Sequence, residues 1–161
     1  LAEMTEYFGE VVQQRMTDPR DDLISWIIEG SRDGGEPLSA RDLVSFCSLL
    51  LIAGNETTTN LLGNAFNAFF ENPAQFDRVK RTNDLGPVVE EVLRYDSPIQ
   101  GILRLTNEQV QIGDAAIPPD AVVMILFGSA NRDERRWENS EQFDVDRDPI
   151  DHLGFGSGIH M

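Results

Sequence analysis

The sequence predicts a mainly α-helical protein of the α+β class, with a long central helix, a small antiparallel β patch and a long coil. Three observations predict this class. Apolar residues recur at helical spacing up to about residue 95, short alternating segments follow up to residue 127, and polar irregular sequence fills residues 129–149. The chain has 161 residues, 40% of them hydrophobic, which is enough to bury a core as one domain.

Two helices are predicted before the central one. Apolar residues at helical spacing predict an amphipathic helix over residues 1–16. After the breaking sequence TDPRDD, the segment LISWIIEG predicts a short helix that Gly30 ends.

The longest predicted element runs from about Ala40 to Glu71. Ser39 and Asp42 resemble a capping box at its start, and the following Asn-Pro pair ends it. Its apolar core, LVSFCSLLLIAG, is too short to span a bilayer and is followed by the polar sequence NETTTN. We therefore expect a buried helix and no membrane segment.

Two further helices and several strands follow. The Asn-Pro pair starts one helix, and GPVVEEVLRYDSP predicts another. The segments ILRLT, EQVQIG and AAIPPDAVVMILF, separated by turn residues, predict strands and hairpins. The coil after Ser129 is long enough to require an anchor within a compact domain.

Composition excludes several classes of function. A net charge of −15, from 28 acidic and 13 basic residues, argues against a nucleic-acid surface and against adhesion to an anionic membrane. The single cysteine, Cys47, allows no disulfide within the chain, so we expect a reducing, cytoplasmic location. The sequence LAEMTEYFGE lacks a start methionine and the basic region of a signal peptide, and we expect an excised piece of a longer protein.

The sequence AGNETT lies in the middle of the central helix. Gly54 weakens the helix, and the Thr57 hydroxyl can bond to the carbonyl of Ala53 and bend the local ladder. A carboxylate at Glu56 beside this hydroxyl suits proton delivery to a ligand packed against the helix. The alternative is an exposed polar turn on a partly solvated helix.

Glu91 and Arg94 in EEVLR lie on one helix face. As an exposed pair they would contribute only a few tenths of a kcal/mol. A buried pair would differ, because the Arg94 guanidinium has donors left to hold carbonyls of a distant coil. In FDVDR, Phe143 is expected to be a small anchor and Arg147 a solvated charge, unless Arg147 reaches the Glu91–Arg94 helix.

The last segment, HLGFGSGIHM, is rich in glycine. A dinucleotide-binding loop would need glycine where Ile159 stands, and no lysine follows as in a nucleoside-triphosphate loop. The glycines permit close approach of the backbone to a bulky group, Phe155 offers a flat face, and His160 offers a donor for a carboxylate.

The ordered set AGNETT, EVLR, Leu103-Arg104, FDVDR and FGSGIH resembles the cytochrome P450 family of haem-thiolate monooxygenases, in its soluble bacterial type. The resemblance runs from about residue 18 to the end. It implies that residues 1–161 are the C-terminal portion of a single cytochrome P450 catalytic domain. HLGFGSGIHM matches the family's haem loop up to the position before its axial cysteine, which is expected immediately after Met161.

The resemblance implies site roles and a haem b cofactor in the parent protein. Gly54, Glu56 and Thr57 match the turn that binds and protonates dioxygen, and Glu91, Arg94 and Arg147 match a structural triad. Haem-contacting positions are matched by Arg104, Phe155, Gly156 and His160. Substrate-facing positions are matched by Ala53, Thr58, Ile99 and Ile102, which implies a small apolar substrate.

The resemblance also implies a ferredoxin-type redox partner for the parent protein. The chain by itself is expected to bind no haem and to be catalytically inert, because it lacks the axial ligand and no metal ligand replaces it. Cys47 is expected to be a small core residue. The arginines at 132, 135 and 136 are a candidate for docking the redox partner, and the alternative is a solvated loop.

Two alternatives stay open. The chain alone could be a non-catalytic, self-associating module, because the apolar face made for haem would be exposed. The second alternative is a relative of the family that uses peroxides in place of dioxygen, although the Glu56–Thr57 pair favours activation of dioxygen.

Overall fold

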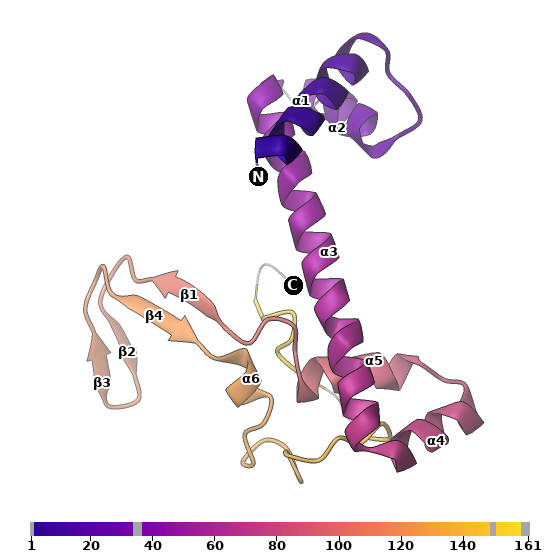
Figure 1. Ribbon diagram of the computed structural model, residues 1–161. Coiled ribbons are helices and arrows are strands. Elements are labelled where there is room, and N and C mark those ends of the chain that lie inside the picture. The colour runs from indigo at the N-terminus through magenta and orange to yellow at the C-terminus, as the bar shows by residue number, and fades with distance from the viewer. Residues whose placement is uncertain (1, 34–36, 149–150, 159–161) are drawn as a thin grey trace. The chain divides into compact units, whose positions relative to one another are not determined.

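The computed structural model describes residues 2–33, 37–148 and 151–158 (Figure 1). The chain divides into two compact units, Leu1–Glu56 and Thr57–Met161. The elements in chain order are α1 (Ala2–Thr17), α2 (Leu23–Asp33), α3 (Ala40–Glu71), α4 (Pro73–Thr82), α5 (Gly86–Tyr95), β1 (Ile102–Leu105), β2 (Val110–Ile112), β3 (Ala115–Ile117), β4 (Val122–Ile125) and α6 (Phe127–Ala130). The small strands and the dominant helices confirm the predicted class.

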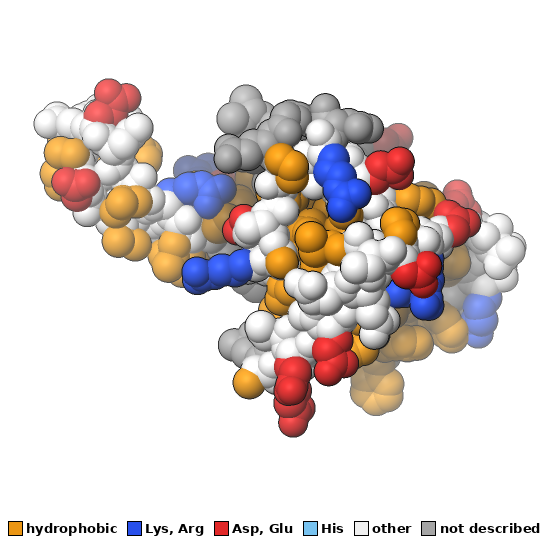
Figure 2. Space-filling model, turned by 90° about the horizontal axis from the view of Figure 1, so that it is seen from above, with side chains coloured by type: hydrophobic (Ala, Val, Ile, Leu, Met, Phe, Trp, Pro, Cys, Tyr) orange, Lys and Arg blue, Asp and Glu red, His pale blue; other side chains and the backbone are white. Residues whose placement is uncertain are grey.

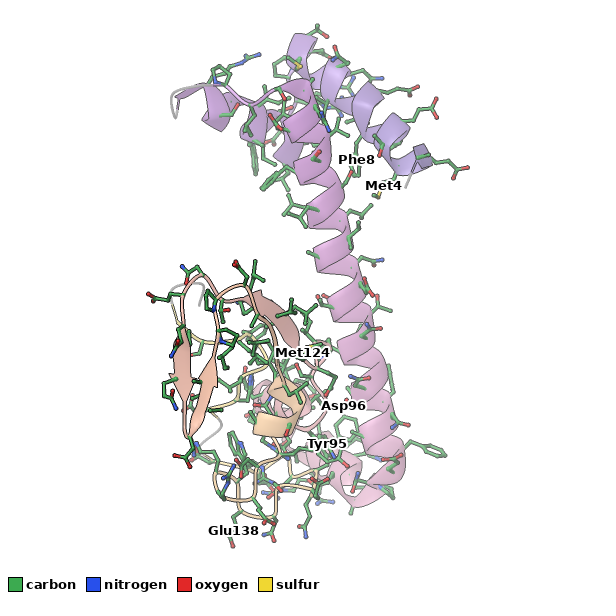
Figure 3. The ribbon with its side chains drawn as sticks, turned by 90° about the vertical axis from the view of Figure 1, so that its left-hand side faces the viewer. Met4, Phe8, Tyr95, Asp96, Met124 and Glu138 are labelled. Carbon is green, nitrogen blue, oxygen red and sulfur yellow. The ribbon has the colours of Figure 1, made fainter. Side chains whose placement is uncertain are left out.

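The first unit is built from α1, α2 and the first part of α3. Its core holds one or two apolar side chains from each helix, namely Val12, Ile28, Leu43 and Cys47. Met4 and Phe8 lie on successive turns of α1 (Figure 3), and Phe8 packs against this core. The predicted first helix is therefore confirmed.

The second helix does not end where the sequence predicts. It continues past Gly30 to Asp33. Gly30 does not have the positive φ of a C-terminal glycine cap, and a glycine inside a helix costs only about 1 kcal/mol relative to alanine.

The central helix α3 has the predicted bounds, but its expected burial is wrong, because most of its residues are exposed. The Ser39 hydroxyl accepts the amide of Asp42 at 3.2 Å and donates to the Asp42 carboxylate at 2.6 Å, which caps the first turn. The helix is continuous through Gly54 and Thr57. Within the described residues, no helix combines the length and the apolar character needed to cross a membrane.

The second unit packs the end of α3 against α4, α5 and the coil. Asn72 precedes Pro73 at the first position of α4, and Asn83 ends the helix in the left-handed conformation. The core consists of Ala68, Val79, Val88, Val92, Phe143 and Val145. Phe143 anchors the coil, as predicted, because its ring packs edge-on against Phe69 and also contacts Tyr95.

The predicted antiparallel patch consists of two separate strand pairs. β1 pairs with β4, so that Ile102 faces Ile125, and β2 pairs with β3. The β2–β3 pair lies beyond the end of the β1–β4 pair, and the two together form an arm (Figure 1) that carries hydrophobic side chains at its surface (Figure 2). Gly101 precedes β1, where an added Cβ would lie 2.7 Å from the carbonyl oxygen of Ile125. Only glycine permits this approach without a shift of the backbone.

Candidate functional site

An open groove of about 530 Å³ lies in the second unit, between the start of β1 and the glycine-rich segment. Aliphatic and aromatic side chains from three stretches of the chain line it, among them Ile99, Ile102, Ile125, Phe127, Leu153 and Phe155. The lining is mostly apolar, which suits a hydrophobic ligand.

The glycine-rich segment forms one wall of the groove. Gly156 and Gly158 have φ angles of 81° and 97°, a backbone conformation that side-chain-bearing residues rarely adopt. Phe155, which directly precedes Gly156, leaves 71% of its surface exposed and lines the groove. His160 lies outside the described residues.

Arg104 on β1 is the cationic residue of the groove. Its side chain is exposed and donates to the carbonyl oxygen of Leu103 at 3.1 Å. Among the described residues, no carboxylate pairs with Arg104, whereas Arg132, Arg135 and Arg136 each have one. The Arg104 guanidinium is therefore available to an anionic group of a ligand in the groove.

Glu91 and Arg94 form a completely buried ion pair on α5. Arg94 Nε and Nη2 donate to the two Glu91 carboxylate oxygens, both at 2.8 Å, and neither side chain has exposed surface. Arg147 reaches the same carboxylate from the coil, with Nε 3.2 Å from Glu91 Oε2. Of the two possibilities stated for Arg147, the structure has the one in which the residue reaches the Glu91–Arg94 helix, and its side chain is only 11% exposed.

The remaining donors of Arg94 hold the coil. Arg94 Nη1 donates to the carbonyl oxygens of Asn131 and Ser140, each at 2.9 Å, and Nη2 donates to that of Gln142 at 3.0 Å. The Glu91 carboxylate accepts the amide of Asp144 at 2.9 Å. Because these bonds use the backbone of the coil, the network gives the coil the anchor that its length requires.

The turn of α3 with the predicted catalytic residues is mostly exposed. Glu56 is the last residue of the first unit and Thr57 the first residue of the second. Ala53, Gly54, Glu56 and Thr58 are exposed and Thr57 is half-buried. None of these five is among the described residues that line the groove.

Two residues that sequence reasoning missed hold the glycine-rich segment. Asn131 Oδ1 accepts the amide of Leu153 at 2.7 Å, and His152 Nδ1 accepts the amide of Gly154 at 3.0 Å. A buried asparagine and a half-buried histidine carry no distinctive local pattern, so the sequence alone gives no signal for these contacts.

Comparison with known proteins identifies the family. The sequence model described as Cytochrome P450 matches residues 85–160, which hold the buried ion pair, the groove and most of the glycine-rich segment. The chain is also 38% identical over 160 residues to 6-deoxyerythronolide B hydroxylase of Saccharopolyspora erythraea, covering 99% of this chain and 40% of that protein. The chain belongs to the cytochrome P450 family.

Solved cytochrome P450 structures share the fold. A cytochrome P450 from Chondromyces apiculatus, CYP109Q5, matches with a TM-score of 0.91 at 49% identity, covering 99% of this chain and 41% of that one. P450BioI in complex with an acyl carrier protein that carries hexadec-9Z-enoic acid matches with a TM-score of 0.91 at 39% identity, covering 99% and 41%. The chain thus spans about 40% of the length of the curated relatives it matches.

Cytochrome P450 proteins bind haem, whose iron takes a ligand from the protein. Within the described residues, no group of three or more His, Cys, Asp or Glu side chains is arranged to hold a metal ion. Cys47 is buried in the core of the first unit, and this burial raises the pKa of its thiol. A buried thiol in an apolar core is a poor candidate for a metal ligand.

The arginine-rich stretch of this cytochrome P450 chain does not form a free basic surface. Arg132 pairs with Glu141 at 2.8 Å and lies over the Tyr95 ring, and Arg136 pairs with Asp151. Arg135 pairs with Asp133, and the resulting hydrogen bond lowers the pKa of the Asp133 carboxyl to about 2. Neutralised in this way, the stretch offers little net positive charge to an acidic partner.

Proposed function

We propose that the protein to which this chain belongs is a haem-dependent monooxygenase that inserts one oxygen atom from dioxygen into a small apolar substrate. The observation that carries the proposal is the groove in which an apolar wall, the positive-φ glycine Gly156 and the cation Arg104, which pairs with no carboxylate of the described residues, meet in a cytochrome P450 chain. Bound haem would supply the redox chemistry that activates dioxygen.

The residues of the groove fit haem. A porphyrin is flat and apolar apart from two propionates, and the groove offers an apolar wall with one guanidinium. Arg104 would pair with a propionate in a charge-assisted hydrogen bond. Gly156 would let the backbone approach the ring, because it has no Cβ. A Cβ added at Gly156 would lie 4.0 Å from Phe127 Cζ and would have no closer neighbour among the described residues. His160 would contact the second propionate, and Phe155 would cover the axial sulfur.

Two residues of the α3 turn would transfer protons. The Glu56 carboxylate is exposed and can exchange a proton with water, and the Thr57 hydroxyl next to it can accept that proton and pass on its own. The apolar or small side chains of Ala53, Ile99 and Ile102, with Thr58, would face the substrate. Glu91, Arg94 and Arg147 would have no chemical role and would hold the coil in place.

The location and the electron donor follow from the same proposal. We place the protein in the cytoplasm, with electrons supplied by a ferredoxin-type partner. Since the arginines of the coil are already paired with carboxylates, that partner would dock elsewhere than on this stretch.

Spectroscopy of the intact protein tests the proposal. The reduced protein treated with carbon monoxide is expected to show the Soret band of a thiolate-ligated haem, and the same preparation is expected to oxygenate an apolar substrate. The 161-residue chain alone is expected to show no such band, because its single thiol, Cys47, is buried. Absence of the band from the intact, haem-loaded protein would contradict the proposal.

A matched pair of arginine variants tests the groove. Arg104→Ala is expected to weaken haem binding about tenfold or more, because it removes a hydrogen bond to a charged group. Arg81→Ala removes an exposed arginine of α4 and is the control, with unchanged haem affinity expected. Equal haem affinities of the two variants would exclude Arg104 from the cofactor site.

A second candidate, self-association of the chain, is favoured by one observation on α3. The side chains of Leu49, Leu50, Leu51, Ile52, Leu62 and Phe66 are between 40% and 75% exposed. An apolar surface of this kind favours association with a second copy. Sedimentation of the 161-residue chain is expected to show dimers or larger species, and a strictly monomeric chain at high concentration would refute this candidate.

A further inference from the structure

The first turn of the glycine-rich segment is held by two side chains, that of Asn131 from outside the segment and that of His152 at its start. The amide of Leu153 donates to Asn131 Oδ1 at 2.7 Å, and the amide of Gly154 donates to His152 Nδ1 at 3.0 Å. The segment then closes a turn of its own, in which the amide of Gly156 donates to the carbonyl oxygen of Leu153 at 2.9 Å. Three hydrogen bonds within four residues thus define the backbone path that leads into the groove.

Asn131 connects this segment to the buried ion pair. The residue is 1% exposed, and its backbone carbonyl accepts a hydrogen bond from Arg94 Nη1 at 2.9 Å. Its side-chain amide points to the carbonyl oxygen of Leu93 at 3.5 Å, while its side-chain oxygen holds Leu153. One residue therefore contacts Arg94 through its backbone and the glycine-rich segment through its side chain.

His152 connects the segment to α5. Its side chain is 5% exposed, and Nε2 lies 3.1 Å from Glu90 Oε2. Because Nδ1 accepts the amide of Gly154, the ring proton belongs on Nε2, from which it is donated to Glu90. The fit is close: a Cβ added at Gly154 would lie 3.1 Å from His152 Nδ1 and 3.2 Å from the carbonyl oxygen of Leu93.

We propose that Asn131 and His152 are positioning residues that fix the path of the glycine-rich segment along the groove. Asn131 couples that path to Arg94, and His152 couples it to Glu90 on the same helix. The role in holding the segment stands on the contacts alone. The further statement that the segment is held for haem rests on the proposed function.

Hydrogen exchange of the segment's amides in the intact protein, without added haem, tests the positioning role. Asn131→Ala is expected to speed exchange at Leu153 about five- to tenfold, because the amide loses its acceptor. Asn64→Ala is the control, because Asn64 also donates its side-chain amide to a backbone carbonyl, that of Asp96 at 2.7 Å. Asn64 and Asp96 both lie far in sequence from the glycine-rich segment. Equal exchange at Leu153 in both variants would overturn the role of Asn131.

His152 allows a rescue experiment, which also serves if Asn131→Ala fails to fold. An asparagine at position 152 places Oδ1 where it can accept the amide two residues on, as in an Asx turn, so His152→Asn is expected to keep Gly154 protected. His152→Phe keeps the ring and loses the acceptor, so exchange at Gly154 is expected to rise by the same five- to tenfold. Equal exchange at Gly154 in the two variants would overturn the role of His152.

Haem release separates this inference from the proposed function. If the segment is held for haem, Asn131→Ala and His152→Phe are expected to release haem about five- to tenfold faster than Asn64→Ala and His152→Asn. Faster amide exchange with unchanged haem release would support the positioning role and overturn its assignment to the cofactor. An intact protein that takes up no haem would contradict the proposed function, and the exchange results would still decide the positioning role.

Discussion

Arg94 and Glu91 meet one helical turn apart on α5 through two hydrogen bonds of 2.8 Å, with no exposed surface on either side chain. The stability of such a pair depends on the geometry of its hydrogen bonds as well as on its charges. Burial of two charges is costly, and the mutual attraction offsets that cost only when the remaining donors and acceptors are also satisfied. Here three coil carbonyls and the guanidinium of Arg147 satisfy them.

Glu91→Gln is therefore expected to destabilise the protein by about 3–5 kcal/mol, because it leaves the Arg94 charge buried without a counter-ion. The measurement is the free energy of unfolding in urea. Asp18→Asn, which breaks the exposed Arg20–Asp18 pair, is the control and is expected to change stability by less than about 1 kcal/mol. Similar losses in the two variants would show that the burial of the pair has no energetic consequence.

Gly54→Ala and Gly63→Ala separate helix stability from function on α3. An added Cβ meets nothing within 4 Å at either position, so each variant is expected to gain about 1 kcal/mol from better helix propensity. Only Gly54 belongs to the proposed oxygen-binding turn, so Gly54→Ala alone is expected to slow oxygenation. Thermal unfolding and product formation are the two measurements. Equal activity of both variants would remove Gly54 from the site.

Asp22 should show a pH-dependent contribution to the stability of the first unit. The hydrogen bond from Arg15, followed by the amide of Ser25, lowers the pKa of the Asp22 carboxyl to about 2 from its ordinary 3.8. Since the folded pKa is the lower one, the stabilisation is complete above about pH 4 and is lost as the pH falls towards 2. NMR titration of this carboxyl is expected to give a midpoint near 2 and not near 4, and Asp22→Asn is expected to flatten this part of the stability profile.

Cys47 should be unreactive in the folded protein. Burial raises the pKa of its thiol, so the thiolate fraction at mildly alkaline pH is smaller than that of a free cysteine. Labelling by a thiol reagent, followed by mass spectrometry of the peptide with Cys47, is expected to be slow until denaturant is added. Rapid labelling of the folded protein would show that the first unit opens readily.

Elements with strong terminal signals could be predicted from the sequence. The bounds of α3 follow from Ser39 and the Asn72-Pro73 pair, which act locally on the backbone. The predicted end of α2 at Gly30 is wrong, because a glycine does not by itself force a left-handed cap. In the same way, local turn chemistry predicts strands but leaves open how they pair.

Contacts between distant residues could not be predicted from residue type alone. The bond between Arg147 and Glu91 spans 56 residues, and residue types alone state only that the contact would be significant if it formed, whereas the family resemblance implies it through the matched triad. The Asn131–Leu153 and His152–Glu90 contacts join irregular backbone to other elements over 22 and 62 residues. Their partners are fixed by the folded path of the coil, for which hydrophobic periodicity gives no signal.

The hydrogen bonds from Arg94 to three coil carbonyls influence which substitutions the coil tolerates. Every amino acid carries a carbonyl oxygen, so the contacts to Ser140 and Gln142 set no requirement on the side chains there. Gln142 is exposed, so the coil can accept other residues at that position while its path stays constant, whereas Ser140 is 6% exposed and its burial limits the size of a replacement. Asn131 is different, because its carbonyl and its side chain are both engaged. A library randomised at these three positions would accept the widest range of residues at Gln142.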